Sequence, residues 1–359
     1  MKLHSFPVIL LTCAGWAAGA AARAQQLPPI EPPKPMPAAP GAAPSLRVTT
    51  TEVLVPTLVE QKDGSILYGL KQSDFVLEDN GVQQMIKVQE EMDTAPVALV
   101  VAVEEGGSSV LEFGKLAQLG PLLDVFLFDP RSQVALVGFD SVPHLLQDFT
   151  HSGGEIDTKL KQLQPGRGGA AILDTVNYAV SLLESEPKSY RRVLLLISEE
   201  RDHGSKHTKP VQLIRRIGES DVLVLSVSFS AGLAELAGGL KGPYYGQTTP
   251  AHAPTPGLPE QTAGGNLLAP LAMLINATRK NVTKEVAAMS GGEYTTFVGN
   301  KAFQAEILRA ARDARNRYLI TFSPSDPTPG LHTIRVRTVE DFGARIVARA
   351  NYWRDDGGR

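Results

Sequence analysis

The sequence predicts an α/β fold: a doubly wound, mostly parallel sheet with a small β module built from segments N- and C-terminal to it. Two observations predict this class. Apolar runs of strand length alternate with helical periods between residues 97 and 312, and strand-and-turn patterns lie on both sides of that region. Because 43% of the 359 residues are apolar and 20% are charged, the chain can bury a core, and its length suggests about two domains.

Residues 1–24 have the pattern of a cleaved secretory signal peptide. Lys2 precedes an apolar run over 6–22, and Ala22-Arg23-Ala24 places small residues at a cleavage point before Gln25. A membrane anchor is one alternative, but the run is short and rich in small residues. Lipidation at Cys13 is another. Cleavage leaves 33 basic and 38 acidic residues, a net charge of −5, and predicts a secreted, periplasmic or outer-envelope protein.

Two further stretches have the composition of linkers or loops. Residues 25–45 hold eight prolines in 21 residues, which favours extended polyproline II and cannot bury a core. Residues 231–265 are rich in glycine, proline, threonine and alanine, and form a longer connection than compact domains usually contain. We expect 25–45 to be a linker and 231–265 to be a mobile loop, with a functional loop as the alternative.

The β module takes residues 46–93 from one side and residues 316–354 from the other. Val, Ile and Thr are frequent in both parts, and Asn80-Gly81 is typical of a tight hairpin turn. Because both parts are strand-like, we expect one module completed by the two segments. The expected strands are 46–55, 74–79, 85–89 (the return strand of the hairpin), 318–323, 333–338 and 345–352.

Residues 96–314 predict the α/β domain. The run Val97–Val103 is apolar without interruption, as expected of a central parallel strand that is covered on both faces. Pro96 marks the start of this domain. The other expected strands are 133–139, 193–198, 222–229 and 293–297, and the expected helices are 111–126, 156–163, 172–183, 211–217, 268–289 and 302–312.

Composition and motifs argue against several classes of function. A net charge of −3 without a basic run does not favour nucleic-acid binding. The single cysteine allows neither a disulfide framework nor a thiolate zinc cluster. No Gly-x-Ser-x-Gly elbow is present, so we expect no enzyme activity. His203 and His207 have the spacing of a zinc pair on a helix, but Gly204 predicts a solvated loop there.

Four stretches of the sequence share their order and spacing with one family. They are Gly69–Phe75 with Leu77–Gly81, Pro96–Val101, Arg192–Ser198, and a C-terminal set made of Tyr318–Pro324, His332–Val336 and Arg349–Tyr352. Together these stretches resemble the bacterial secreted von Willebrand factor A-related proteins that are abundant in acidobacteria. The resemblance implies a von Willebrand A-like α/β domain and a role in protein binding or cell adhesion.

The resemblance also implies where a metal-ion-dependent adhesion site would lie. Its pattern is Asp-x-Ser-x-Ser after the first strand, a Thr in a later loop and an Asp after the fourth strand. Here Glu104, Gly106 and Ser108 follow the first strand, or Glu105, Gly107 and Ser109 if the alignment slips by one residue. The Thr position holds Ala170, and Glu199 follows the fourth strand.

These departures predict a degenerate metal site. Two of the three hydroxyls are missing and each carboxylate lies one methylene further out, which does not suit the near-ideal octahedron that Mg²⁺ requires. We therefore expect no metal cofactor, or weak Ca²⁺ or Mg²⁺ binding at Glu104, Ser108 and Glu199, with Ca²⁺ the more tolerant ion. Two close carboxylates would repel, and a cation, Arg167, Arg201 or solvent could relieve that repulsion.

The sequence favours an exported protein-binding or adhesion module. We expect it to recognise a protein partner without a cation, through the edge of the sheet that carries Glu104, Ser108, Ala170 and Glu199, with a contribution from 231–265. A structural component of the envelope or of a surface assembly is the alternative. A metal-dependent hydrolase is a further alternative, which only the His203 and His207 pair supports. No nucleic-acid partner and no membrane span in the mature chain are expected.

Overall fold

The computed structural model describes residues 52–89, 95–229 and 268–355. These described residues belong to one compact unit. The predicted signal peptide, the linker at 25–45, the start of the first expected strand and the loop at 231–265 lie outside the described residues.

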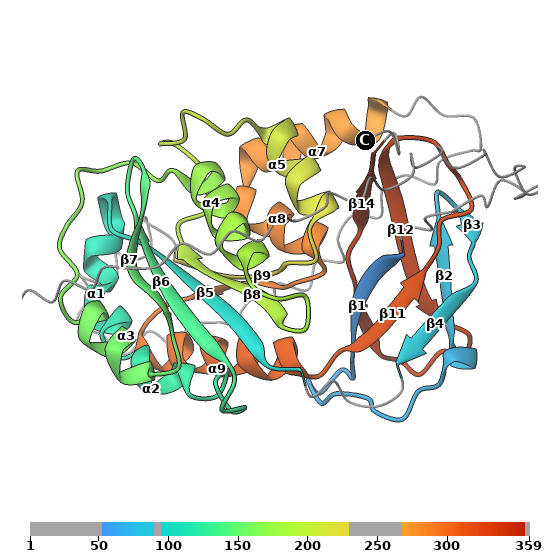
Figure 1. The fold of residues 1–359 in the computed structure, drawn as a ribbon, viewed down its shortest axis with the longest axis horizontal. Coiled ribbons are helices and arrows are strands. Elements are labelled where there is room, and N and C mark those ends of the chain that lie inside the picture. The colour runs from blue at the N-terminus through green and yellow to red at the C-terminus, as the bar shows by residue number, and fades with distance from the viewer. Residues whose placement is uncertain (1–51, 90–94, 230–267, 356–359) are drawn as a thin grey trace, which may run out of the picture. The chain divides into compact units, whose positions relative to one another are not determined.

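A six-stranded sheet forms the centre of the α/β domain, with the order β10-β9-β8-β5-β6-β7 (Figure 1). The strands are β5 (Val97–Glu104), β6 (Gln133–Phe139), β7 (Pro143–Thr150), β8 (Arg191–Ser198), β9 (Leu223–Phe229) and β10 (Tyr294–Phe297). All neighbours are parallel except β6 and β7. Every residue of β5 is buried, because helices cover both faces of the sheet. The predicted mostly parallel, doubly wound fold is confirmed.

Each face of the sheet packs against its own layer of helices. Residues Val97, Leu99 and Val101 of β5 face one layer, and Ala98 and Val100 face the other. The first layer holds the 3₁₀ helix η2 (Gly107–Glu112), α1 (Phe113–Leu116), α2 (Gly120–Leu123), α3 (Gly153–Leu160) and α9 (Asn300–Arg315). The second layer holds α4 (Ile172–Ser185), α5 (Pro210–Glu219), α7 (Leu268–Lys280) and α8 (Val282–Ser290).

Two expected helices are interrupted. The expected helix at 111–126 is divided into η2, α1 and α2, and Pro121 stands in the first turn of α2, where its missing N–H costs no helical hydrogen bond. The expected helix at 268–289 is divided at Asn281, whose side chain accepts a hydrogen bond from the Lys284 N–H at 2.9 Å and begins α8.

The antiparallel strand β7 was not expected from the sequence. Its side chains are half-buried or exposed rather than continuously buried, because it lies at the edge of the sheet. Its pattern therefore lacks the apolar run that marks the inner strands.

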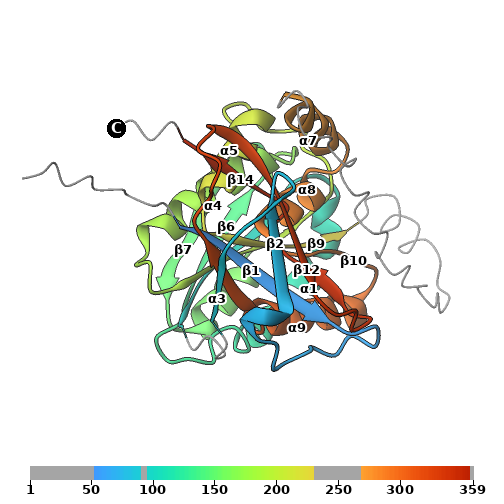
Figure 2. The same cartoon turned by 90° about the vertical axis from the view of Figure 1, so that its right-hand side faces the viewer.

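The β module consists of two antiparallel four-stranded sheets (Figure 2). One has the order β13-β1-β11-β4 and the other β14-β12-β2-β3. Its elements are β1 (Val53–Glu60), the 3₁₀ helix η1 (Gln72–Asp74), β2 (Phe75–Asp79), β3 (Val82–Gln83), β4 (Ile86–Gln89), β11 (Tyr318–Phe322), β12 (Gly330–Thr338), β13 (Arg345–Val347) and β14 (Asn351–Arg354). Strands from both sides of the α/β domain pair with one another and share one apolar core, as predicted.

Two details of the β module differ from the sequence-based expectation. The strand that returns from the Asn80-Gly81 turn is β3, whereas β4 pairs with β11 in the other sheet. Gln84 lies between them, with its side chain bonded to Val82 O and to Ser325, and it marks the point where the chain changes sheet. The expected strand at 345–352 is divided into β13 and β14, which also belong to different sheets.

Buried arginines join the β module to the α/β domain. Arg349 donates hydrogen bonds to Leu54 O in β1 and to Ile217 O and Gly218 O at the end of α5, at 3.3, 3.2 and 2.9 Å. Arg317 donates to Gly291 O, after α8, at 2.6 Å. Because these guanidinium groups satisfy backbone carbonyls of both parts, they tie the β module to the helices that flank the central sheet.

Candidate binding rim of the α/β domain

The carboxyl ends of the parallel strands meet at one edge of the central sheet, which we call the rim. It is formed by residues 104–109, 140–142, 166–171 and 198–209. β5 and β8 are parallel neighbours, so Glu104 and Glu199 end at the same edge. The Glu199 N–H donates a hydrogen bond of 2.9 Å to Glu104 Oε2. The structure therefore brings together the two carboxylates that the sequence placed here.

Glu104 is a buried acid whose charge is only partly compensated. Its side chain is 1% exposed, and its Oε1 atom has no hydrogen-bond partner within the described part of the chain. Burial raises the pKa of Glu104 to about 8, and the nearby Glu199 charge acts in the same direction, while the hydrogen bond from the Glu199 N–H opposes it. The Glu104 carboxyl is therefore mostly protonated at neutral pH.

Close backbone packing occupies the position of the first hydroxyl in the family pattern. A Cβ atom added to Gly106 would lie 2.4 Å from Gly169 O and 3.2 Å from the Gly168 backbone. The loop before α4 thus contacts the loop after β5 directly. A serine does not fit at Gly106 unless these two loops move apart.

The position of the pattern's threonine is also enclosed. Ala170 is fully buried, and its carbonyl accepts a hydrogen bond from the His203 N–H at 3.1 Å. A Cβ atom on Gly204 would lie 2.7 Å from the Ala171 nitrogen, so the loop after β8 packs tightly over this point. Ala170 is a packing residue in this arrangement and supplies no hydroxyl.

Glu105 and Ser109, the residues of the alignment shifted by one position, contact other groups. Glu105 is directed toward β6: its carboxylate lies over Gly138 and 3.1 Å from His144 Nε2. The Ser109 hydroxyl is buried and donates to Gly106 O at 2.6 Å. Glu104, and not Glu105, is therefore the acid that meets Glu199. The Ser108 side chain is not among those that the structure describes.

His203 is the group that contacts Glu199. Residues 201–209 form a loop, as expected, and His203 Nε2 lies against Glu199 Oε1. His207 contributes its backbone N–H to Asp174. Neither Arg167 nor Arg201 forms an ion pair with Glu104 or Glu199 among the described residues, so the suggested relief by these arginines is not found.

Asp174 holds the loop after β8 in place, and it was not singled out from the sequence. This buried residue in the first turn of α4 accepts N–H hydrogen bonds from Lys206 at 2.9 Å and from Thr208 at 2.6 Å. Burial alone would raise the pKa of Asp174, but these hydrogen bonds outweigh it and hold the pKa below its usual value. No local signal in the sequence pointed to this role, because the N–H groups that Asp174 accepts from are 32 to 34 residues away along the chain.

The rim does not fit a Mg²⁺ ion of the adhesion-site type. Gly106 and Ala170 offer no oxygen side chain, one oxygen of Glu104 is bonded to an N–H group, and Glu199 is in contact with His203. In the regions that the structure describes, no three His, Cys, Asp or Glu side chains converge as a metal site. Mg²⁺ needs six well-placed ligands, most of them oxygens from the protein or from water.

Residues 109–201 match the family model of the von Willebrand factor type A domain. The α/β domain therefore has a von Willebrand factor A-like fold. Domains of this type are generally non-catalytic modules for protein interaction, and the matched residues run from η2 through α4 to the loop after β8. The match thus includes Ala170 and Glu199, but it ends before the β-module strands β11 to β14.

Solved structures of low sequence identity are also similar to the chain. BatB from Bacteroides thetaiotaomicron is 15% identical over 61% of this chain and 100% of that one, with a TM-score of 0.39. An aerotolerance-related membrane protein from Bacteroides fragilis is 16% identical over 60% of this chain and 98% of that one, with a TM-score of 0.39. Identities this low give no information about a shared function.

Proximal thread matrix protein 1 from the mussel byssus is 12% identical over 39% of this chain, with a TM-score of 0.33. The similar part spans 39% of that protein's own length. The comparison with curated proteins finds no match. Among the described residues, no helix is both long and apolar enough to span a membrane.

Proposed function

We propose that this protein is an exported protein-binding module whose type A domain recognises its partner through the rim without a metal ion. The contact between Gly106 and Gly169 O carries this proposal, because it takes the space that a hydroxyl ligand requires. The burial of Ala170 under the loop after β8 supports it. The loops of the rim are packed against and hydrogen-bonded to one another. A partner would therefore contact the side chains on this surface and would not bind through a metal ion.

The side chains exposed at the rim suit contact with another protein. His203 of the rim and His144 of the adjacent β7 are about half exposed, and each contacts a carboxylate, that of Glu199 or Glu105. Val142, in the loop after β6, is an exposed apolar side chain of the same edge. Polar groups held in place and mixed with apolar ones are typical of non-obligate protein interfaces.

A pull-down from an envelope extract tests cation-independent recognition. The full mature chain serves as bait, with and without a chelator, and we expect the same partner in both lanes. A His203→Ala variant should lose most of that partner, whereas Arg337→Gln, which removes a half-exposed arginine of the β module, should retain it. Loss of every partner on chelation contradicts the proposal.

Calorimetric titration of metal-free protein with Ca²⁺, Mg²⁺ and Mn²⁺ tests the metal directly. We expect no saturable binding with a dissociation constant below about 100 µM, because the rim supplies too few oxygens. Tighter binding that disappears in Glu199→Ala would show that a cation site persists at the rim.

Export is part of the same proposal, and the predicted signal peptide supports it. Amino-terminal sequencing of the protein recovered from the periplasm, outer envelope or medium should give a chain that begins at Gln25. A chain that retains Met1 and remains in the cytoplasm would contradict export.

A structural role in an assembly is a second candidate. Among the described residues, β4 is the outermost strand at one side of its four-stranded sheet, next to Met85, whose side chain is 93% exposed. An edge strand of this kind can pair with a strand of another molecule. Size-exclusion chromatography with light scattering separates the two candidates, because assembly predicts defined oligomers that Met85→Lys disrupts, whereas a recognition module remains monomeric.

A further inference from the structure

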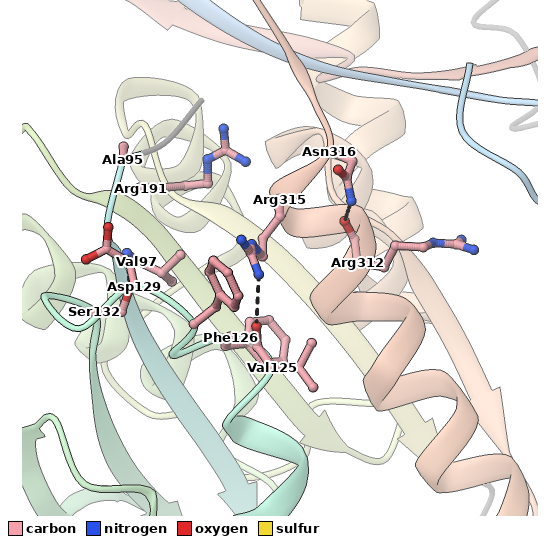
Figure 3. A pocket seen from close by; sticks show the side chains of 11 residues that line it. Ala95, Val97, Val125, Phe126, Asp129, Ser132, Arg191, Arg312, Arg315 and Asn316 are labelled. Carbon is pink, nitrogen blue, oxygen red and sulfur yellow. Dashed lines mark hydrogen bonds between the residues drawn. The ribbon is translucent and has the colours of Figure 1, made fainter. Parts of the chain in front are cut away.

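A cavity of about 610 Å³ lies at the edge of the central sheet opposite the rim. Its lining comes from the start of β5, the segment between α2 and β6, the first residue of β8 and the C-terminal turn of α9 (Figure 3). Pockets that hold small organic ligands usually measure roughly 300–1,000 Å³. The lining residues are Ala95, Val97, Val125, Phe126, Phe128, Asp129, Ser132, Arg191, Arg312, Arg315 and Asn316.

Arg315 gives this cavity a cationic wall. Its guanidinium group lies 4.5 Å from the centre of the Phe128 ring and donates a hydrogen bond of 3.4 Å to Val125 O. No carboxylate of the described residues forms an ion pair with Arg315. Arg312, by contrast, points away from the cavity in Figure 3 and is paired with Asp313 and Glu60.

The acid in the lining does not cancel the charge of Arg315. Both carboxylate oxygens of Asp129 accept hydrogen bonds from the Arg131 side chain, at 3.0 and 2.8 Å. These bonds lower the pKa of Asp129 to about 2, so it stays ionised and paired with Arg131. Arg315 also attracts the Asp129 charge, but more weakly than Arg131 does, so Asp129 is paired mainly with a residue outside the lining.

The carbonyl groups at the C-terminus of α9 are also satisfied. A helix C-terminus carries partial negative charge on its free carbonyls and would repel an anion. Here Asn316 donates to Arg312 O at 2.7 Å, and Arg191 donates to Ala314 O. The end of the helix thus presents amide and guanidinium groups to the cavity.

Ser132 provides a second donor, and it is almost completely buried. It is 2% exposed, and its Oγ accepts a hydrogen bond from the Val97 N–H at 2.9 Å. Its own hydroxyl proton has no acceptor in the described part of the chain. A buried hydroxyl that keeps an unused donor indicates a missing acceptor, because an unmade hydrogen bond is costly away from water.

The remaining surface of the cavity is apolar and partly aromatic. Phe126 is buried at the base, whereas the Phe128 side chain is 74% exposed although it is large and apolar. The arginine against one side of the Phe128 ring leaves a flat apolar surface next to a positive charge. A planar group packed there would place an attached anion near Arg315.

We propose that this cavity binds a carboxylate attached to an aromatic group. Arg315 and Ser132 donate to the carboxylate, and Phe126, Phe128 and Val125 pack against the ring. A free aromatic acid and a protein segment that ends in an aromatic residue with a free carboxyl group share this chemistry. The site lies across the sheet from the rim and does not depend on the function proposed there.

Calorimetry and ¹⁹F NMR with 4-fluorophenylacetate test the proposal on the full mature chain. A ligand of about ten non-hydrogen atoms should bind with a dissociation constant on the order of 1 mM. The uncharged 4-fluorophenylacetamide, with the same ring, should bind at least about tenfold more weakly, because it lacks the charge that Arg315 recognises. A peptide that ends in phenylalanine, compared with its C-terminal amide, distinguishes a protein segment from a free acid.

Three substitutions locate the site. Arg315→Gln and Ser132→Ala should each weaken binding of the acid by about tenfold, and Phe128→Ala by several fold, since each removes one expected contact. Arg337→Gln is the matched control and should leave binding unchanged. Thermal unfolding checks that each variant is folded. We expect Phe128→Ala to remain folded because the Phe128 side chain is exposed.

The proposal is overturned if neither the acid nor the peptide binds saturably below about 10 mM. It is equally overturned if the amide binds as well as the acid, or if Arg315→Gln binds like the unsubstituted protein. Saturable binding by the acid or by the peptide, with the dependence on charge and on Arg315 described above, supports it.

Discussion

The carboxyl groups at the rim occupy very different environments although they lie side by side. Glu104 is buried, has one oxygen without a partner and is mostly protonated at neutral pH. Glu199 lies at the same edge of the sheet and contacts the exposed His203. Burial thus sets the protonation of Glu104, whereas Glu199 contacts an exposed imidazole.

Replacing Glu104 with glutamine should make stability less dependent on pH. The folded-state pKa of about 8 is above the unfolded value of about 4.5, so the native state holds the extra proton and loses stability as pH rises between these values. One pKa unit corresponds to about 1.4 kcal/mol. Relative to the unsubstituted protein, Glu104→Gln should gain on the order of 2 kcal/mol between about pH 5 and pH 8 in urea unfolding. Parallel stability curves would contradict the neutral carboxyl.

His332 is buried in the β module and is hydrogen-bonded to an acid. Its Nε2 lies 2.7 Å from Thr328 O and its Nδ1 lies 3.0 Å from Asp79 Oδ1, while the Tyr352 hydroxyl donates to the other Asp79 oxygen at 2.9 Å. Burial lowers the pKa of His332, but its hydrogen bonds to Asp79 and Thr328 outweigh that effect, and the net pKa is raised.

The stability that His332 contributes should therefore be greatest in acid. A raised pKa gives a contribution that is complete below the unfolded-state value of about 6.5 and disappears as pH rises through the folded-state value. Unfolding of the unsubstituted protein and of His332→Gln, compared at about pH 6 and pH 9, should show a difference in unfolding free energy that shrinks as pH rises. A difference that grows with pH would mean that the buried imidazole is neutral.

At the scale of elements, two loops close the rim by direct backbone contact. The loop after β5 and the loop before α4 meet at Gly106 and Gly169, and the loop after β8 is held above them by Asp174 at the start of α4. The rim therefore depends on three connections that are far apart in the sequence.

Gly106→Ser should destabilise the protein without restoring a metal site. The new Cβ meets a backbone carbonyl at 2.4 Å, which neither loop can avoid by rotating a side chain. We expect a loss of about 1–3 kcal/mol in unfolding free energy and no gain in Mg²⁺ binding by calorimetry. Gly114→Ser is the control, because no atom lies within 4 Å of its added Cβ. Tight Mg²⁺ binding by Gly106→Ser, or by its combination with Ala170→Thr, would overturn this description of the rim.

At the scale of the whole described unit, buried arginines couple the β module to the α/β domain. Arg349 bonds carbonyls of β1 and of the end of α5, and burial lowers its pKa to about 10, which leaves it charged at neutral pH. Close backbone approaches accompany it: a Cβ on Gly218 would meet Trp353, and one on Gly291 would meet Arg349.

Arg349→Met should weaken this coupling. It leaves several buried carbonyls without donors, at about 1–3 kcal/mol each when they stay dry, so we expect a total loss of about 3 kcal/mol or more. Differential scanning calorimetry should change from one transition to two, as the β module and the α/β domain begin to unfold separately. Arg337→Gln should shift stability by less than about 0.5 kcal/mol. A single, unshifted transition in Arg349→Met would show that the contact is dispensable.

The pattern of residues along the chain was enough to predict the fold class, the inner strands of the sheet and the proximity of Glu104 to Glu199. Buried strands such as Val97–Glu104 carry their apolar character in every residue, and parallel neighbours must end at the same edge. Three features became visible only in the folded structure: β7 is the edge strand of the central sheet, β4 pairs outside the β2–β3 hairpin, and Gly106 packs against Gly169. The tertiary structure also decided that Val97, Ser132 and Arg315 enclose one cavity. The reason is physical: a repeating burial pattern is local to the chain, whereas edges, close backbone contacts and cavities exist only where distant segments meet.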